Sequence, residues 1–249
     1  MAASNFALKE ESHISNIFKQ IKFSREFRKK NPYYFRPDGL IVFCGPQGSG
    51  KTLSAVNYVY NLAKIYPRCK IVTNIELTDY PFDNDRVFLF EGADDLKKYS
   101  NGQYGVIFLI DEIQLYFNSL GSKNIDISVM AQISQQRKQR KHIVCTSQVF
   151  GRMAKPLREQ FDVVIFCEKK FFGFMQKNSL IDRNSINSQE STGTNIVGDV
   201  KKVYRYFKNP SSFNRYDTYK VIENKNIKVS RKEVDIYGSE LSSNHWFIS

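Results

Sequence analysis

The stretch LIVFCGPQGSGKTLSAVNYVYNLAKI, residues 40–65, decides the fold of this 249-residue chain. The apolar run 40–44 predicts a buried strand, and the apolar spacing of 51–65 predicts a helix. The residues between them fit GxxxxGK[ST] in full, a pattern in which glycines let backbone N–H groups turn toward phosphates at a helix N-terminus. We therefore expect a nucleotide site formed by Gly45, Pro46, Gln47, Gly48, Ser49, Gly50, Lys51 and Thr52.

The last two residues of this loop have separate expected roles. Lys51 is expected to reach the β- and γ-phosphates, and Thr52 is expected to offer its hydroxyl to Mg²⁺. ATP and Mg²⁺ are therefore the predicted ligands.

A second apolar run, 106–110, ends in two carboxylates. We expect Asp111 at the carboxyl edge of the sheet, beside the phosphate loop, where it would hold Mg²⁺ through water. Glu112 would then polarise the attacking water. Because a phosphotransferase must keep water away from the γ-phosphate, an acid beside the metal ligand favours hydrolysis over kinase chemistry.

A third apolar run, 142–147, ends in the amide Gln148. At the same sheet edge, this side chain is expected to touch both γ-phosphate and water and to report which nucleotide is bound. A polar strand end without this role is the alternative.

Short apolar runs alternate with helical ones along the middle of the chain. Strands are predicted at 40–44, 70–74, 86–91, 105–110, 142–147 and 162–167, and helices at 51–65, 93–100 and 125–139. This order predicts an α/β fold with a mainly parallel sheet covered by helices on both faces. We expect this domain over 40–167, a basic helical extension over 1–39, and a basic, aromatic-rich hairpin and tail over 168–249.

The formal net charge of +12 is unevenly distributed. Residues 40–167 are nearly balanced at +3, whereas 168–232 alone carry +8. A bias confined to the flanks indicates a polyanion surface attached to a nearly neutral catalytic centre. Solvated surface lysines are the alternative.

Composition excludes several classes of protein. No apolar run approaches the ~20 residues that cross a bilayer, and the start lacks the pattern of a secretory signal, so a cytoplasmic protein is expected. Four cysteines without metal-ligand spacing are expected to be buried thiols of a reduced compartment.

The motifs together resemble the additional-strand P-loop ATPases of the FtsK–HerA group, which have a RecA-like fold. Within that group, the chain is similar to the Zot-like ATPases of filamentous phages and to viral genome-packaging ATPases. The segments that carry the resemblance are GPQGSGKT at 45–52, IVTNIEL at 71–77, FLIDEIQLYF at 108–117 and RKQRKHIVCTSQ at 137–148. Phage-assembly Zot proteins typically have a membrane-spanning segment after the ATPase domain, and none is evident here, which favours a DNA translocase or packaging motor.

The resemblance implies a homo-oligomeric ring, commonly a hexamer, in which an arginine of one subunit completes the neighbouring site. A guanidinium stabilises the charge that spreads over the γ-phosphoryl oxygens in the transition state. The sequence leaves open which arginine acts: the candidates are Arg137, Arg140, Arg152 and Arg158.

Two basic segments are candidate contacts for DNA of unknown strandedness. Lys169–Lys177 and Lys201–Lys208 are predicted to be the arms of a hairpin around a loop at 178–199, with cations interleaved with rings that stack on bases. In the alternative, the rings fill a core and only the lysines face water. The basic N-terminal helix is expected to meet nucleic acid, another subunit or an anionic membrane surface.

The sequence thus predicts a Mg²⁺-dependent ATPase that translocates or packages DNA, encoded by a phage or mobile element. The alternatives are a Zot-like assembly ATPase acting on phage portal, capsid or assembly proteins, and a binding module that ATP switches without hydrolysis.

Overall fold

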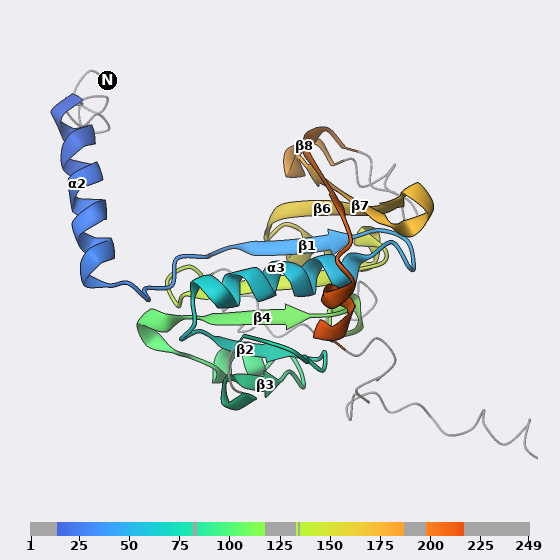
Figure 1. Ribbon diagram of the computed structural model, residues 1–249, viewed down its shortest axis with the longest axis horizontal. Helices are drawn as coiled ribbons and strands as arrows, with labels where there is room; N and C mark the ends of the chain where they lie inside the picture. The colour runs from blue at the N-terminus through green and yellow to red at the C-terminus, as the bar shows by residue number, and fades with distance from the viewer. Residues whose placement is uncertain (1–13, 82–83, 118–132, 134, 187–197, 217–249) are drawn as a thin grey trace, which may run out of the picture.

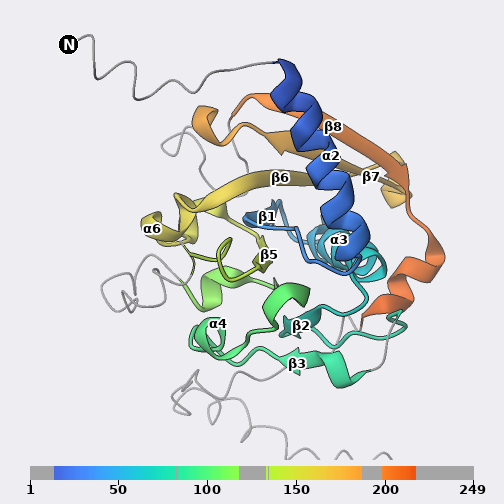
Figure 2. The ribbon, with the colours of Figure 1, turned by 90° about the vertical axis from the view of Figure 1, so that its left-hand side faces the viewer.

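The computed structural model describes residues 14–81, 84–117, 133, 135–186 and 198–216. These residues form one eight-stranded sheet in the order β3-β2-β4-β5-β1-β6-β7-β8 (Figures 1 and 2). The strands are β1 Leu40–Cys44, β2 Lys70–Thr73, β3 Val87–Leu89, β4 Val106–Ile110, β5 Lys141–Ser147, β6 Phe161–Lys170, β7 Met175–Ile181 and β8 Val200–Phe207. The predicted α/β fold is confirmed, and the six predicted strands are all present with small changes at their ends.

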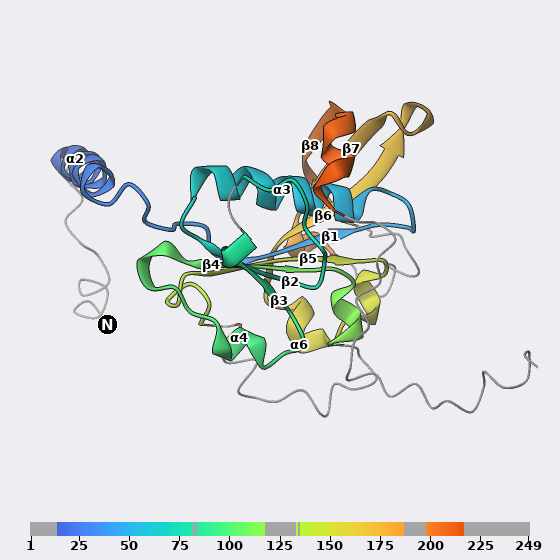
Figure 3. The same ribbon diagram turned by 60° about the horizontal axis from the view of Figure 1, so that its bottom comes forward.

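Helices lie on both faces of this sheet (Figure 3). The helix α3, Lys51–Ile65, covers one face, and the short helices α4, Asp95–Lys98, and α6, Lys155–Arg158, lie on the other. A further helix, α2, Ile14–Lys30, projects away from the sheet (Figure 1). The short 3₁₀ turns are η1 Asn84–Arg86, η2 Gly102–Tyr104, η3 Ile113–Leu115, η5 Phe150–Arg152, η6 Phe171–Gly173, η7 Arg183–Ser185 and η8 Pro210–Arg215.

The central strands are buried on both faces, which explains why they are continuously apolar. Ile41 and Phe43 of β1 pack with Val56 of α3, while Leu40 and Val42 pack into the core on the opposite face. A strand alternates its side chains between the two faces of a sheet. A continuously apolar strand therefore contributes side chains to the hydrophobic cores on both faces of the sheet.

The strand order brings the candidate motifs to one edge. The strands from β3 to β6 are parallel, and β5 lies between β1 and β4. This is the additional strand that the resemblance implies. The carboxyl ends of β1, β4 and β5 therefore meet at the same sheet edge, each followed by one of the predicted polar segments.

The hairpin expected beyond 167 is part of the same sheet. The strand β6 crosses the predicted border and continues to Lys170, and β7 pairs antiparallel with both β6 and β8. The predicted bounds of two hairpin segments, the first arm and the loop, were wrong. Lys169–Lys177 is no single arm, because Phe171, Phe172 and Gly173 have positive φ angles and turn the chain. The predicted loop at 178–199 begins later, since β7 extends to Ile181.

The predicted helices and the two ends of the chain differ from expectation or lie partly outside the described residues. The predicted helix at 93–100 is reduced to Asp95–Lys98. Most of the predicted helix at 125–139 lies outside the described residues, and 135–140 form turns. The start of the N-terminal extension, 1–13, and the tail, 217–249, also lie outside them. Among the described residues, no helix is long and apolar enough to cross a membrane.

Candidate nucleotide site

The predicted phosphate loop follows β1 and ends where α3 begins. Gly50 precedes α3 with φ 87° and ψ 23°, a left-handed conformation that favours glycine. Lys51 is nearly buried, and its Nζ donates to the Pro46 carbonyl oxygen at 3.1 Å, so the ammonium lies within the loop. The loop therefore has the backbone turn and the enclosed cation that phosphate binding requires.

Two glycines allow the loop to pack against the strands β6 and β7. A Cβ at Gly45 would stand 2.6 Å from the Cys167 carbonyl oxygen of β6. A Cβ at Gly50 would collide with the side-chain amide of Gln176 in β7. Glycine is favoured at both positions, because φ is positive at each and the strands β6 and β7 touch the loop there.

The polar ends of β4 and β5 meet the start of α3 around one carboxylate. Asp111 Oδ1 accepts hydrogen bonds from Thr52 Oγ1 at 3.0 Å and from Thr146 Oγ1 at 2.6 Å. Residues that are 59 and 35 positions from Asp111 in the sequence thus converge on it. The structure brings together the two residues expected to hold Mg²⁺.

Asn74, which follows β2, holds the main chain of Asp111 from the other side. Its Nδ2 donates to the Asp111 carbonyl oxygen at 3.0 Å, and its Oδ1 accepts from the Asp111 N–H at 2.8 Å. Asn74 Nδ2 also donates to the Tyr116 hydroxyl at 3.3 Å. The Asp111 backbone is therefore fixed by a side chain as well as by the sheet.

Burial raises the pKa of the Asp111 carboxyl. The hydrogen bonds from Thr146 and Thr52 act in the opposite direction, whereas the Glu112 charge adds to the rise in pKa. A buried anion beside a second carboxylate is stabilised by a cation. Hydroxyl and carboxylate oxygens are also the ligands that Mg²⁺ prefers, so Thr52 and Asp111 fit the predicted metal.

Glu112 has an unusual backbone and two amide partners. Its φ of 50° and ψ of 54° are rare for a residue with a side chain, and its N–H donates to Thr146 Oγ1 at 3.0 Å. One carboxylate oxygen accepts from Gln148 Nε2 at 3.2 Å, and the other accepts from Gln114 Nε2. The predicted base and the predicted sensor are thus in direct contact.

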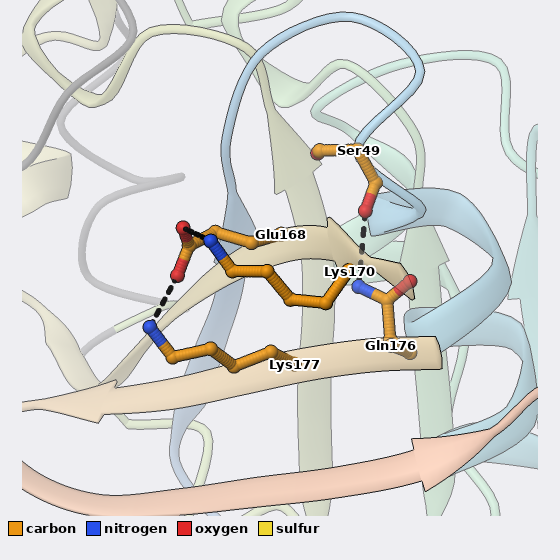
Figure 4. A network of polar contacts seen from close by, with 5 residues as sticks. All are labelled: Ser49, Glu168, Lys170, Gln176 and Lys177. Atoms are coloured by element: carbon orange, nitrogen blue, oxygen red, sulfur yellow. Dashed lines mark hydrogen bonds and ion pairs between the residues drawn. The ribbon is translucent and has the colours of Figure 1, made fainter. Parts of the chain in front are cut away.

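A polar network joins the phosphate loop to β7 (Figure 4). Gln176 is fully buried, and its Nε2 donates to the Ser49 carbonyl oxygen at 3.0 Å and to Asn178 Oδ1 at 3.1 Å. Asn178 in turn bonds Ser54 of α3. These buried amides tie the start of the hairpin to the loop and to α3.

The four candidate arginines are dispersed. Arg137 and Arg140 precede β5, at the sheet edge opposite the phosphate loop. Arg137 Nε contacts Asp38 at 2.7 Å, and Arg140 Nη2 donates to the Tyr34 hydroxyl at 2.9 Å. Arg152 lies in η5 and Arg158 ends α6. Neither Arg137 nor Arg140 reaches the phosphate loop of its own chain.

A family model decides the relationship of this chain to known proteins. The model described as zonular occludens toxin (Zot) matches residues 39–220. The chain belongs to the Zot family. This confirms the resemblance to Zot-like P-loop ATPases, while the placement in the wider FtsK–HerA group stays a prediction. A search of curated protein sequences found no match.

One solved structure with a TM-score above 0.5 shows the same fold. The N-terminal domain of zonular occludens toxin from Neisseria meningitidis is 17% identical, with a TM-score of 0.51, and the match covers 73% of this chain and 100% of that one. The genome-packaging NTPase B204 from Sulfolobus turreted icosahedral virus 2, in complex with ATP-gammaS, is 14% identical with a TM-score of 0.47. That match covers 68% of this chain and 97% of the other. The DNA-packaging ATPase B204 from Sulfolobus turreted icosahedral virus is 13% identical with a TM-score of 0.46, over 68% of this chain and 98% of that one.

Four site residues were not predicted as such from the sequence. Asn74 lies in the segment IVTNIEL and Gln114 in DEIQ, two segments that carry the resemblance but give neither residue a role. Thr146 lies within the predicted strand that ends before Gln148, and Gln176 lies within the predicted basic arm 169–177. The position of Asn74 and Thr146, each a polar residue at the end of an apolar strand, is the sequence signal that could have identified them as site residues.

Proposed function

We propose that this member of the Zot family is a Mg²⁺-dependent ATPase that uses hydrolysis to translocate or package DNA. The observation that carries the ATPase proposal is the meeting of Thr52 and Asp111 at 3.0 Å, with Glu112 next in the chain. This arrangement supports a phosphate loop, a metal site and a base at one sheet edge.

The loop residues hold the triphosphate in this proposal. Backbone N–H groups of 45–52 and the Lys51 ammonium would bind the phosphate oxygens, with the N-terminus of α3 beneath them. Thr52 and Asp111 would hold Mg²⁺, which when bound neutralises charge on the phosphates. Asn74 fixes the Asp111 backbone, and so positions that carboxylate.

Glu112 is the proposed general base. Its carboxylate takes a proton from the attacking water, and the amides of Gln148 and Gln114 orient this carboxylate. Because Gln148 contacts Glu112, a change at the γ-phosphate that moves Gln148 would also move the base. Positioning of this kind accounts for much of phosphoryl-transfer catalysis.

Completion of the site by an arginine from a neighbouring subunit remains part of the proposal. Arg137 and Arg140 lie opposite the phosphate loop of their own chain, a placement that suits action on a neighbour in a homo-oligomeric ring. Arg152 and Arg158 remain candidates.

The DNA contact is proposed for the surface of β6, β7 and β8. Phe171, Phe172, Phe174, Tyr204 and Phe207 are all exposed, and the exposed fraction of Phe172 reaches 96%. The alternative in which these rings fill a core is therefore wrong, although Tyr206 is half-buried and lies within hydrogen-bond distance of Ser54. Exposed rings among lysines provide sequence-indifferent stacking and phosphate contacts.

Turnover of ATP by the full chain, with and without DNA, tests the proposal. We expect Lys51→Ala to lose nucleotide binding and Glu112→Gln to bind ATP while its kcat falls by about 10²–10⁴-fold. Glu91→Gln, an exposed carboxylate after β3, is the matched control. Full activity of Glu112→Gln would refute the assignment of the base.

The DNA arm of the same experiment separates the motor from its alternatives. DNA should stimulate turnover, with a steep decline as salt increases. Turnover without a response to any polynucleotide would favour an assembly ATPase acting on a protein machine, the second candidate, which the Zot family match supports. Binding of ATP without turnover under any condition would favour the ATP-switched module.

A further inference from the structure

The lysines of β6, β7 and the end of β8 differ in whether a carboxylate neutralises their charge. Lys170 and Lys177 both contact Glu168, at 3.0 Å and 2.6 Å (Figure 4). The hydrogen bond from Lys177 is the main cause that lowers the pKa of Glu168. Across the described parts of the chain, no carboxylate forms an ion pair with Lys169 or Lys208.

Strand pairing directs Lys169 toward the phosphate loop. Lys169 of β6 is the register partner of Gln176 of β7, and Gln176 donates to the Ser49 carbonyl oxygen. Lys169 Nζ lies 3.8 Å from the point where a Cβ on Gly48 would stand. Its neighbour Lys170 points to Glu168 instead, as alternation along a strand requires.

A second ammonium lies close to Lys169. Burial lowers the pKa of Lys208, and the positive charge of Lys169 adds to this effect. Two neighbouring cations repel each other, and a bound anion lowers the free energy of such a pair. The phosphate loop is the candidate anion-binding element next to Lys169.

We propose that Lys169 is a second phosphate-binding cation of the nucleotide site, acting from the side opposite Lys51 on the phosphates of a nucleoside triphosphate. Gln176 positions the loop between them through its bond to Ser49. This inference rests on the proposed nucleotide binding and adds a residue from the β6–β7 extension. The β6 strand would then contribute to both the nucleotide site and the candidate DNA surface.

Displacement of a fluorescent ATP analogue from the full chain tests this role. The competitors are ATP and inorganic tripolyphosphate, which carries the phosphates without the nucleoside. We expect Lys169→Met to lower the affinity for both competitors by about 10-fold, the effect of losing one charge-assisted hydrogen bond. Lys170→Met is the matched control, and should stay within about twofold of the wild type since Lys170 faces Glu168.

A conservative variant separates charge from packing. Lys169→Arg keeps the cation and should recover most of the affinity, whereas Lys169→Gln should behave as Lys169→Met does. Thermal melting of each variant shows whether the fold is retained. Weakening by Lys169→Arg equal to that by Lys169→Met would contradict a charge contact.

The outcomes distinguish this inference from the proposed function. If the wild type binds ATP and Lys169→Met binds it equally well, Lys169 has no role and the ATPase proposal stands. If Lys169→Met loses DNA binding alone, the cation belongs to the DNA surface and the inference is wrong. If the wild type binds no nucleotide, the proposed function fails and the inference fails with it.

Discussion

Asn74 holds both main-chain groups of Asp111, donating to its carbonyl oxygen at 3.0 Å and accepting from its N–H at 2.8 Å. The two residues follow the adjacent parallel strands β2 and β4. A side-chain amide thereby continues the pairing of these strands by one residue beyond their ends. The position of the Asp111 carboxylate then depends on a neighbouring strand as well as on its own.

Replacement of Asn74 by alanine should impair the metal-dependent step. Because loss of a residue that orients a metal ligand typically costs 10–100-fold, we expect kcat for ATP hydrolysis to fall by about that factor. The Mg²⁺ concentration for half-maximal activity should rise, while ATP binding without Mg²⁺ changes little. Asn101→Ala is the control, since the Asn101 amide bonds Arg68 and Gly105 near η2 instead. An unchanged Mg²⁺ dependence would contradict this role.

Gln176 is expected to matter for nucleotide affinity more than for stability. Gln176→Leu removes the bonds to the Ser49 carbonyl oxygen and to Asn178 Oδ1, and it also removes Oε1, a buried acceptor without a hydrogen-bond partner among the described residues. Because these two effects on stability oppose each other, the melting temperature should shift little. The Kd for ATP, measured by calorimetry, should rise by about 5–10-fold because the loop loses the hydrogen bond that holds Ser49.

A carboxylate at position 176 should be worse than leucine. Gln176→Glu can no longer donate to Ser49 when ionised, and it adds a negative charge beside the phosphate loop. The expected order of ATP affinity is wild type, then leucine, then glutamate. Equal affinities of the two variants would show that charge at this position has no influence on the loop.

The exposed rings of the hairpin should carry part of any DNA affinity. Phe172→Ala or Phe207→Ala should weaken binding of single-stranded DNA by about 1–3 kcal/mol, because ring–base stacking has that magnitude. Ile65→Ala removes an exposed apolar side chain from the end of α3 and is the control. Fluorescence anisotropy measures the DNA affinity of each variant. If all variants bind DNA as tightly as the wild type, these rings are not part of the interface.

His142 should make the protein less stable in mild acid. Its ring bonds the Tyr58 hydroxyl at 3.0 Å and the Gly39 carbonyl oxygen at 3.1 Å, and burial lowers its pKa. The unfolded chain takes up a proton near the ordinary pKa of about 6.5, while the folded chain does not. The free energy of unfolding should therefore fall as the pH decreases through that value, and hold above it.

A variant without a titratable ring isolates this effect. His142→Gln should show a smaller difference in unfolding free energy between neutral and mildly acidic pH. Tyr58→Phe keeps the imidazole, so it should retain the pH dependence. Denaturant titrations at both pH values provide the comparison, and an equal pH dependence for His142→Gln and the wild type would assign the effect elsewhere.

The sequence predicts the local parts of this molecule well. The turn at 45–52 depends on glycines and a helix start that adjoin in the chain, and the strands β1 and β4 are recognisable from continuous apolar runs. Their carboxyl ends meet at one edge because parallel strands require it. Thr52 and Asp111 could be paired in advance for this reason, although they are 59 residues apart.

The polar residues of β7 are harder to place from the sequence, which predicts an arm that ends at 177 and a loop from 178. Gln176 and Asn178 are buried in β7, where the Gln176 amide donates to Asn178 and to the Ser49 carbonyl oxygen, and the Asn178 amide bonds the Ser54 hydroxyl of α3. Propensity gives no information about such partners, and Gln176 is 127 residues from Ser49. The same limit applies to Asn74, whose amide geometry depends on the spacing of β2 and β4.

The sequence by itself therefore determined the phosphate loop, the acidic pair and the α/β class, because each depends on neighbours in the chain or on the parallel alternation of strands and helices. Tertiary structure alone decided that β7 and β8 extend the central sheet, that Gln176 supports the loop and that Lys169 lies beside it. These are contacts between distant segments, and their free energy depends on which polar groups the folded sheet brings within hydrogen-bond distance.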